Sequence, residues 1–387
     1  MSVRSHLDLP MFFEPAHAEL GRALTASFRG ADGDLHAPAR VIPRLATLGL
    51  LELVVPKDDG RVDVRALSLA REAMAYVSPL ADAIFAVQGL SAHPLVLTPG
   101  FARRTEILAA MRRGERTGGF ALTEPDAGSD VASMRTSARR EQGAWVLDGE
   151  KCFISNVGVA SHFVVFANAD PAAGKRGISA FLVEASAPGL TLEPIPTSSE
   201  HPLGRLLLDG CRVPESSLVG EVGQGLRLAL GTLDVFRTSV GGAACGMAQR
   251  ALDETLARVG ARRQFGQRLA DFQLTQAAVA DMATELDAAR LLVYRAAWLK
   301  DRGGAPSEES VATQPAVAVA MAKMFATEAA QRIIDRAVQL HGGLGVASSS
   351  VVEGLYREIR PLRIYEGTTE IQKLIVGSAL TKERTLS

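Results

Sequence analysis

Apolar and polar positions divide the chain into two helical regions that flank a region of short strands. In residues 1–117, Arg65–Val87 is rich in Ala, Leu and Met, and Phe101–Arg113 is a second compact stretch of the same kind. Both compositions favour helices. Pro43, Pro79 and Pro94 punctuate this part of the chain, and prolines commonly mark helix boundaries. We therefore expect a helical N-terminal domain.

Residues 118–225 have the pattern of short strands separated by turns. The β-rich runs are Gly119–Leu122, Ala144–Leu147, His162–Ala167 and Ile178–Val183. Turn-forming residues such as Pro125-Asp126-Ala127-Gly128 lie between them. Several short strands within about 100 residues are typical of an antiparallel barrel or sandwich, so we expect a middle β-domain.

Long helices return over residues 226–387. The clearest is Gln314–His341, which keeps one face apolar and is followed by Gly342-Gly343, a suitable helix stop. Asp271–Lys300 and Gly367–Leu380 are two further candidates. The sequence contains no internal repeat. The predicted fold is therefore mostly α, with a central β-domain and a C-terminal helical bundle.

Composition and charge exclude several classes of protein. Of the 387 residues, 47% are hydrophobic and 22% are charged, and the formal net charge of −1 gives no reason to expect a nucleic-acid partner. The three cysteines form no CxxC pair and indicate no disulfide framework, so a cytoplasmic location is expected. No HExxH motif predicts a zinc site, and no run of about 18 apolar residues predicts a membrane span.

Two segments of the middle region carry residues suited to a cofactor. Leu122–Asp130, with the sequence LTEPDAGSD, predicts a strand and a turn whose hydroxyls and amides could hold a phosphate or the edge of a flavin. Gly149–Asn156 predicts a strand in which Phe153 and Ser155 share one face, which places an aromatic ring beside a hydroxyl. Taken alone, the first segment is better interpreted as an ordinary turn, and the second could be merely a hairpin strand.

Two other segments have weaker chemical content. Gly220–Gly225 has the glycine spacing of a dinucleotide loop in reverse and lacks a surrounding βαβ unit, so an exposed loop is the better interpretation. The run Arg262-Arg263-Gln264-Phe265-Gly266, followed by Phe272-Gln273, places an arginine either against a phosphate or at a solvated helix end.

The segment Tyr365-Glu366-Gly367 places a glutamate between an aromatic residue and a glycine. An apolar helix follows, and helix N-termini favour negative charge. Gly367 would let a substrate come close to the backbone. Since most glutamates are solvated surface residues, the pattern alone gives a hypothesis for a catalytic base.

Four of these motifs resemble the acyl-CoA dehydrogenase family and occur in register with it. They are LTEPDAGSD from Leu122, GEKCFISN from Gly149, RRQFGQRLADFQ from Arg262, and QLHGG from Gln339 followed by YEGTTEIQ from Tyr365. The resemblance is good over about residues 100–380 and looser before them. It implies an N-terminal helical domain, a middle β-domain, a C-terminal four-helix bundle, bound FAD, and a homotetramer or dimer in which a neighbouring subunit completes each FAD site.

The resemblance also implies roles for individual residues. Those expected at the FAD are Phe120, Leu122, Thr123, Gly128, Ser129, Phe153, Ile154, Ser155, Arg262, Gln264, Phe265, Phe272, Gln273, Gln339, Gly342, Gly343, Thr368 and Glu370. The acyl-CoA substrate would contact Ser129, Asp234, Arg237, Tyr365 and Gly367.

By the same resemblance, the predicted reaction is the α,β-dehydrogenation of an acyl-CoA thioester. Glu366 would remove the α-proton as general base while a hydride leaves the β-carbon for flavin N5. An electron-transfer flavoprotein is the expected electron acceptor. The alternatives are a dehydrogenase for acyl groups on a carrier protein, an acyl-CoA oxidase, and a non-catalytic scaffold.

Several positions depart from the family pattern. Phe153 and Ser155 replace the more usual Trp and Thr, and Val55–Arg61 matches a Pro-Glu-x-x-Gly-Gly turn only loosely. Phe236 stands where some branched-chain members carry their base, which argues against an isovaleryl substrate. No arginine lies within Asp82–Gln88 to pair with a dicarboxylate tail, which argues against a glutaryl substrate.

Overall fold

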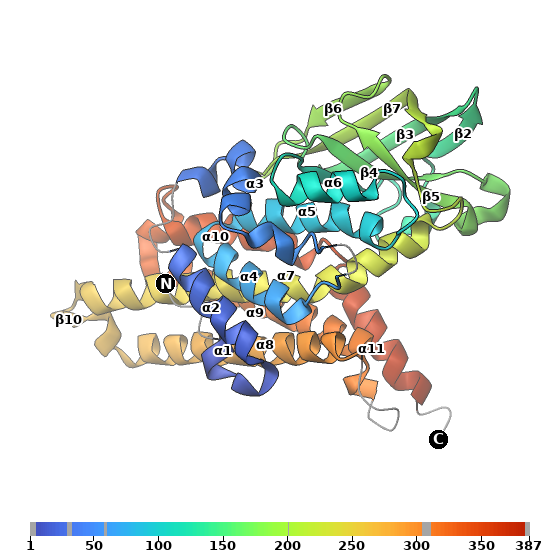
Figure 1. Cartoon of the computed structure of the whole chain (residues 1–387). Coiled ribbons are helices and arrows are strands. Elements are labelled where there is room, and N and C mark those ends of the chain that lie inside the picture. Colours follow the sequence, from blue (N-terminus) through green and yellow to red (C-terminus); the bar gives the residue numbers. More distant parts are fainter. Residues whose placement is uncertain (1–4, 29–32, 58–59, 200, 304–310, 384–387) are drawn as a thin grey trace. The chain divides into compact units, whose positions relative to one another are not determined.

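The computed structural model describes residues 5–28, 33–57, 60–199, 201–303 and 311–383, which form two compact units (Figure 1). The described residues within 1–31, 63–82 and 237–387 form the helical unit. Those within 32–62 and 83–236 form the sheet unit. Helices α5 (Pro79–Val96) and α7 (Gly225–Ala261) contribute residues to both. The boundaries of the three predicted domains stay a prediction.

The helical unit combines N-terminal segments with the long C-terminal helices. Besides parts of α5 and α7 it contains α1 (Ser5–Asp8), η1 (Pro10–Phe12), α2 (Pro15–Ser27), α4 (Val64–Val77), β9 (Arg263–Gln264), β10 (Gln267–Arg268), η7 (Leu269–Asp271), α8 (Gln273–Asp301), η8 (Val311–Thr313), α9 (Pro315–His341), η9 (Gly342–Val346), α10 (Val351–Ile359), η10 (Arg360–Arg363) and α11 (Thr369–Glu383). Predicted helix Gln314–His341 is therefore confirmed within one residue.

One apolar core holds α7, α8, α9 and α10 together. Val240, Met282, Ile333 and Val352, one from each helix, are fully buried in it. Burial of one such aliphatic side chain contributes about 1.5–3 kcal/mol. Proline at the start of α9 and Gly342, whose φ is +62°, at its end explain why this helix was recognisable in the sequence.

The predicted helical stretch Arg65–Val87 is two helices. Ser78 is extended, with φ −149° and ψ 103°, and α5 begins at the following Pro79. The residue before a proline is pushed out of the helical region, which explains the break. Pro43 and Pro94, in contrast, lie inside α3 (Pro38–Thr47) and α5, so neither ends its helix.

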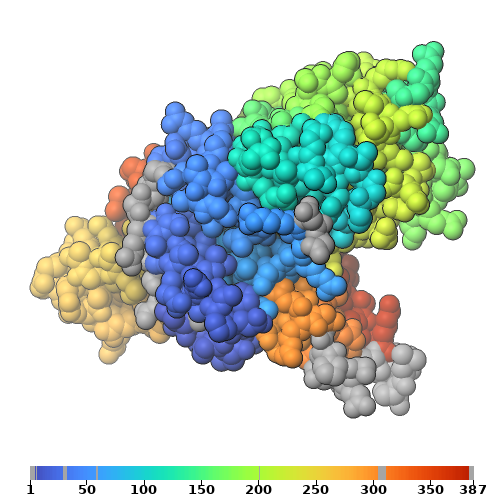
Figure 2. All heavy atoms as spheres, in the orientation of Figure 1, coloured from blue at the N-terminus to red at the C-terminus, as the bar shows by residue number. Residues whose placement is uncertain are grey.

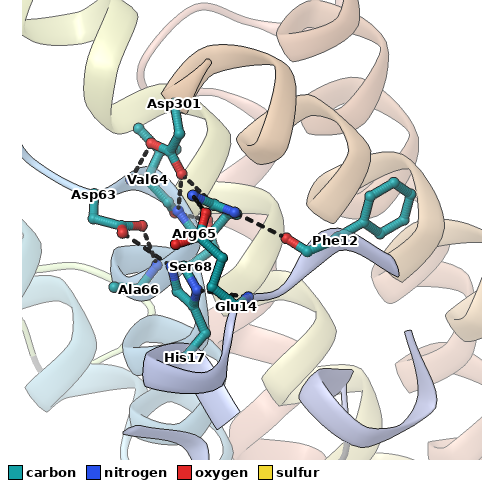
Figure 3. Close-up of polar contacts among 9 residues, drawn as sticks. All are labelled: Phe12, Glu14, His17, Asp63, Val64, Arg65, Ala66, Ser68 and Asp301. Carbon is teal, nitrogen blue, oxygen red and sulfur yellow. Dashed lines mark hydrogen bonds and ion pairs between the residues drawn. The ribbon is translucent and has the colours of Figure 1, made fainter. Parts of the chain in front are cut away.

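Charged side chains join the N-terminal segment to α4 and to the end of α8 (Figure 3). Arg65 Nε donates to Asp301 Oδ2 at 2.8 Å. Asp63 caps α4 by accepting from the Ala66 N–H at 2.9 Å, and it also pairs with His17 Nε2 at 2.9 Å. An N-cap of this kind contributes about 1 kcal/mol. The network fixes the start of α4.

The sheet unit is built on one eight-stranded sheet. Its strands are β1 (Gly118–Ala121), β2 (Ser137–Glu141), β3 (Ala144–Ser155), β4 (His162–Asn168), β5 (Ile178–Glu184), β6 (Leu190–Pro194), β7 (Leu203–Pro214) and β8 (Leu218–Val219). Their order is β6-β7-β3-β2-β4-β5-β8, with β1 also paired to β4. The other elements are η2 (Gly33–His36), α3, η3 (Leu50–Leu53), α6 (Arg104–Arg112), η4 (Val131–Ser133), η5 (Pro171–Gly177) and η6 (Glu215–Ser217).

The sequence predicted an antiparallel sheet, but the observed sheet also contains parallel pairs. β4 pairs in parallel with β1 and, through Ser137 and Asn168, with β2. The hairpin of β2 and β3 lies between β1 and β4 in the chain, which allows β1 and β4 to run in the same direction. The core of the sheet contains Trp145, Phe163 and Phe181, each at most 6% exposed. The middle β-domain is therefore confirmed, with this correction to its topology.

The glycines of Gly220–Gly225 serve packing before α7. A Cβ on Gly225 would lie 2.5 Å from the carbonyl carbon of Ser179, and the Gly223 N–H donates to Ser179 Oγ at 2.9 Å. Such a close approach of backbone to backbone requires glycine. The segment is a turn against β5, with Glu221 and Val222 exposed.

No helix in the described part of the chain is long and apolar enough to cross a membrane. A cytoplasmic location stays a prediction.

Candidate active site

Glu366 stands in a strained turn between η10 and α11. Its φ is +52° and that of Gly367 is +94°, so two successive residues are left-handed. This region is unfavourable for a residue with a Cβ. Thr368 then caps α11, because its Oγ1 accepts from the Ile371 N–H at 3.3 Å. The predicted helix Gly367–Leu380 is confirmed with a start at Thr369.

Three side chains hold this turn by its carbonyl groups. Arg237 Nε, from α7, donates to the Glu366 carbonyl at 2.8 Å. Lys323 Nζ, from α9, and Gln372 Nε2, from α11, donate to the Gly367 carbonyl at 2.8 and 3.1 Å. Hydrogen bonds from charged donors are stronger than neutral ones, and they offset the unfavourable backbone conformation.

The carboxyl group of Glu366 is prepared to take a proton. Its Oε2 is buried and has no hydrogen-bond partner among the described residues. Burial raises the pKa of Glu366, whereas Arg71, Arg237 and Lys323 oppose this rise. A carboxylate with a raised pKa is a stronger base, and the neighbouring cations keep its charged form accessible.

The pKa of Lys323 is also affected by this site. Lys323 is fully buried in α9. Burial lowers its pKa to about 8, although Glu366 acts in the opposite direction. Glu328, on the same helix, accepts from Arg363 Nε and Thr369 Oγ1 at 2.8 Å each, which ties both ends of the turn to α9.

Replacing Gly367 with alanine is expected to lower turnover more than tenfold while FAD stays bound. A Cβ at this position would lie 2.5 Å from Gln372 Nε2, so one of the bonds that hold the turn must break. Misplacement of a reacting group by about 1 Å can cost about 100-fold in rate. Gly377→Ala on α11 is the matched control, because no atom lies within 4 Å of its added Cβ. Steady-state rates that are equal in the two variants would contradict this view of the turn.

Sequence reasoning missed a buried charge pair in the helical unit. Arg71, on α4, donates from Nε and Nη2 to the two carboxylate oxygens of Asp82, both at 2.8 Å. Its Nη1 donates to Ser239 Oγ at 3.1 Å. Arg71 and Asp82 are each 1% exposed. No arginine lies within Asp82–Gln88, yet one reaches Asp82 from the preceding helix.

In the sheet unit, the GEKCFISN segment forms the end of β3, where Phe153 is exposed, Ile154 is buried and Ser155 is half-buried. The register of β3 against β7 shifts between Lys151 and Ile154, and Phe153 has a φ of +56°. This irregularity leaves the Phe153 ring 64% exposed, whereas Ile154 is 2% exposed. An irregular strand re-aims a side chain in this way. The structure thus presents an exposed aromatic surface, with Ser155 half-buried.

An ion pair that the sequence did not predict lies behind this segment. Lys151 is fully buried, and its Nζ donates to Glu124 Oε1 at 2.7 Å and to the Leu122 carbonyl at 3.2 Å. Glu124 also accepts from the backbone N–H groups of Arg135 and Thr136 at 2.6 and 3.0 Å. Burial lowers the pKa of Lys151 to about 8, and Glu124 partly offsets this effect.

The two predicted flavin segments are therefore brought together in the sheet unit. The Cys152 N–H donates to the Thr123 carbonyl at 3.0 Å, which adds a backbone link to the ion pair. Phe120 on β1 packs against Phe166 with ring centroids 5.0 Å apart. Gly128 and Ser129 are exposed in the turn that follows.

Other predicted FAD residues lie on the surface of the helical unit. Arg262, Gln264 and Gln273 are exposed around the β9–β10 hairpin, and Phe265 is 94% exposed. In Figure 2 this gold-coloured segment forms exposed surface. Phe265 contacts Phe272 edge-on, with centroids 6.3 Å apart.

Gln339, Gly342 and Gly343 are exposed at the end of α9. Arg336 pairs with Glu285 at 2.6 Å and with Asp281 at 3.8 Å, so the end of α9 lies beside the first half of α8. Lys323 is sixteen residues from Gln339 along α9, which corresponds to about 24 Å. Within one chain, these FAD residues therefore lie well away from the turn that carries Glu366.

The remaining positions are consistent with the sequence argument. Phe236 is fully buried and packs edge-on against His93 with centroids 5.8 Å apart, so it is a core residue. Asp234 is half-buried two residues earlier on α7. Of the segment Val55–Arg61, residues 58 and 59 lie outside the described residues, and the Gly60 N–H donates to the Lys57 carbonyl at 2.6 Å.

Comparison with known families identifies the chain. Residues 119–211 match the family model "Acyl-CoA dehydrogenase, middle domain", and residues 223–381 match "Acyl-CoA dehydrogenase, C-terminal domain". The chain belongs to the acyl-CoA dehydrogenase family. It is an oxidoreductase of a family that depends on FAD.

Characterised relatives resemble the chain over most of its length. The 3-(aryl)acrylate reductase of Clostridium sporogenes is 34% identical over 96% of this chain and 100% of its own. Mouse mitochondrial short-chain specific acyl-CoA dehydrogenase is 37% identical over 89% of this chain and 83% of its own. The structure of butyryl-CoA dehydrogenase from Megasphaera elsdenii has 30% identity and a TM-score of 0.85, covering 95% of this chain and 99% of that one.

The residues present fit a flavin dinucleotide. The Phe153 ring offers a flat apolar surface, and the half-buried Thr123 and Ser155 lie on the linked segments beside it. The exposed Arg262 and the glycines at the end of α9 suit an anionic pyrophosphate. No group of three or more His, Cys, Asp or Glu side chains in the described residues is arranged to hold a metal ion.

Proposed function

We propose that the protein catalyses FAD-dependent α,β-dehydrogenation of an acyl-CoA thioester to the 2,3-enoyl-CoA. The observation that carries this proposal is the state of Glu366. Its Oε2 is buried without a partner in the described part of the chain, beside three cationic side chains, on a turn held by donors from α7, α9 and α11. A surface glutamate needs no such support.

Glu366 acts as the general base on the carbon next to the thioester. The Cα–H bond breaks, its proton passes to the carboxylate, and the electron pair is delocalised onto the thioester oxygen. Arg237, Lys323 and Gln372 keep the base in place, because they hold the turn by its carbonyls rather than by the carboxylate. Bound FAD supplies the oxidising power by accepting a hydride from the β-carbon.

Phe120, Leu122, Thr123, Gly128, Ser129, Phe153, Ile154 and Ser155 would hold the FAD in the sheet unit, and Thr368 and Glu370 would reach it from the start of α11. Ser129, Asp234, Arg237, Tyr365 and Gly367 would contact the substrate. The remaining set, Arg262, Gln264, Phe265, Phe272, Gln273, Gln339, Gly342 and Gly343, would serve a neighbouring subunit. The distance along α9 and the 94% exposure of Phe265 support a homo-oligomer.

The physiological electron partner is proposed to be an electron-transfer flavoprotein. The Acetobacterium woodii relative, "Caffeyl-CoA reductase-Etf complex subunit CarC", is 35% identical over 89% of this chain. This name, with that of the arylacrylate reductase, also favours a second candidate function, namely the same chemistry run as enoyl thioester reduction. Glu366 would then return the proton to the α-carbon.

The test is a titration of the purified protein under anaerobic conditions. We expect a flavin absorption spectrum that is bleached by at least one saturated acyl-CoA in a panel of chain lengths. If only enoyl-CoA thioesters reoxidise the chemically reduced flavin, the protein is a reductase. A flavin that no CoA thioester affects would overturn the proposed substrate class and leave carrier-bound thioesters or oxygen chemistry. A protein that cannot bind FAD would refute the proposal altogether.

A further inference from the structure

We propose that the buried Arg71–Asp82 pair is a positioning device for the catalytic base, with Arg71 and Asp82 acting on proton removal by Glu366 in opposite directions. This inference rests on the proposed function. Arg71 is a positioning residue, because it acts through Tyr365 and Glu366 and has no assigned contact with the substrate.

Arg71 joins three elements of the helical unit. Its guanidinium, on α4, is bound to Asp82 near the start of α5 and to Ser239 on α7. The charge of Arg71 also opposes the rise that burial causes in the pKa of Tyr365, the residue before the base. The guanidinium fork is rigid and planar. It therefore ties α4 to α5 and to α7, and Ser239 on α7 lies two residues from Arg237, which holds the Glu366 carbonyl at 2.8 Å.

The same pair changes the charge around the base. Arg71 exerts the largest opposing influence of any charge on the raised pKa of Glu366, and Asp82 acts in the reverse direction. The other charged groups nearby are Arg237 on α7 and Lys323 on α9, which favour the carboxylate. Glu328 on α9 and Glu370 on α11 act on Lys323. The phenol of Tyr365 completes the set, and burial raises its pKa.

A purely structural role explains the pair poorly. Two charges removed from water carry a desolvation cost of several kcal/mol each, and apolar residues of similar size commonly replace such pairs without loss of stability. The pair nevertheless acts on the base electrostatically, and it is bonded to Ser239 on α7, the helix whose Arg237 holds the turn. A role in setting the proton affinity of Glu366 accounts for both its burial and its place.

The experiment measures α-proton removal separately from hydride transfer. The probe is a 3-thia-acyl-CoA, in which sulfur replaces the β-carbon, so that deprotonation produces a bound enolate and no hydride can follow. The long-wavelength absorption of the enolate beside the flavin is recorded against pH in the holoenzyme. In the wild type it should appear as Glu366 becomes ionised with rising pH.

Opposite shifts of the midpoint are the expected result. Arg71→Gln removes the favourable charge, so the midpoint should rise by about 1 pH unit, whereas Asp82→Asn leaves Arg71 unneutralised and should lower it by a similar amount. The double variant R71Q/D82N should return close to the wild-type midpoint. If R71Q fails to fold, D82N compared with the double variant still isolates Arg71, since both lack the Asp82 charge.

Arg65 provides a matched control on the same helix. It forms an ion pair with Asp301 at 2.8 Å, as Figure 3 shows, and Arg65→Gln removes an equal charge from α4. R65Q should lower thermal stability and leave the midpoint in place. The inference would be overturned if the midpoints of R71Q and D82N shift in the same direction. It would also be overturned if neither midpoint differs from that of R65Q. If the wild-type protein does not form the enolate and no acyl-CoA bleaches its flavin, the proposed function is refuted instead.

Discussion

Glu366→Gln is expected to lower turnover by about 10³ to 10⁴-fold while FAD binding and thermal stability are retained. General-base catalysis contributes factors of this size. Glutamine has the shape of glutamate but no basic oxygen. Arg237, Lys323 and Gln372 bond to the carbonyls of the turn and not to the Glu366 side chain, so the substitution leaves the turn intact.

The measurement combines the acyl-CoA turnover rate with exchange of the substrate α-hydrogen in deuterated water. Both should fall together, because both require proton removal. Glu254→Gln is the control, since Glu254 forms a surface ion pair with Arg250 at 2.8 Å on α7. A fully active E366Q variant would assign the base to another residue, and the core position of Phe236 leaves no carboxylate at the alternative site.

The order of helices and strands could be predicted because hydrophobic periodicity is a local property. Predicted helix Asp271–Lys300 is α8, Gln273–Asp301, and predicted strand Ile178–Val183 is β5, Ile178–Glu184. β7 was missed although its buried and exposed positions alternate through much of its length. Its run Leu206-Leu207-Leu208 has no polar residue between apolar ones, which conceals that period in the sequence.

Glu366 could be proposed as the base from sequence, but the buried side chains around it could not be predicted. The local pattern around Glu366 gave a hypothesis for a base, and the resemblance of its neighbours to a family motif strengthened it. A lysine on an amphipathic helix such as α9 is expected on the polar side of that helix, yet Lys323 is fully buried. Arg71 and Asp82 meet across eleven positions and a helix break, and no local pattern encodes such a contact.

Replacing Lys151 with methionine is expected to lower stability by about 3–5 kcal/mol and to weaken FAD binding at least tenfold. Removal of one partner from a buried ion pair leaves an uncompensated charge, which is strongly destabilising. Here the orphan would be Glu124, which is 6% exposed. The Leu122 carbonyl would also lose its bond from Lys151 Nζ. The predicted flavin segments around Thr123 and Phe153 would then be joined mainly by the Cys152–Thr123 backbone bond.

Two measurements separate the effect on stability from the effect on FAD binding. Denaturant unfolding of the apoprotein gives the free energy of unfolding, and flavin fluorescence titration gives the FAD dissociation constant. Lys175→Met is the control, because Lys175 is exposed in the same unit and its loss should change neither quantity. In K151M/E124Q the orphan charge is gone, and the single amide oxygen can still accept from one of the backbone N–H groups of residues 135 and 136, which bond to different oxygens of Glu124. Stability should therefore recover in part, whereas FAD affinity should not, since the link to Leu122 is still absent. If stability and FAD affinity both recover, the pair serves stability alone and has no part in arranging the predicted flavin segments.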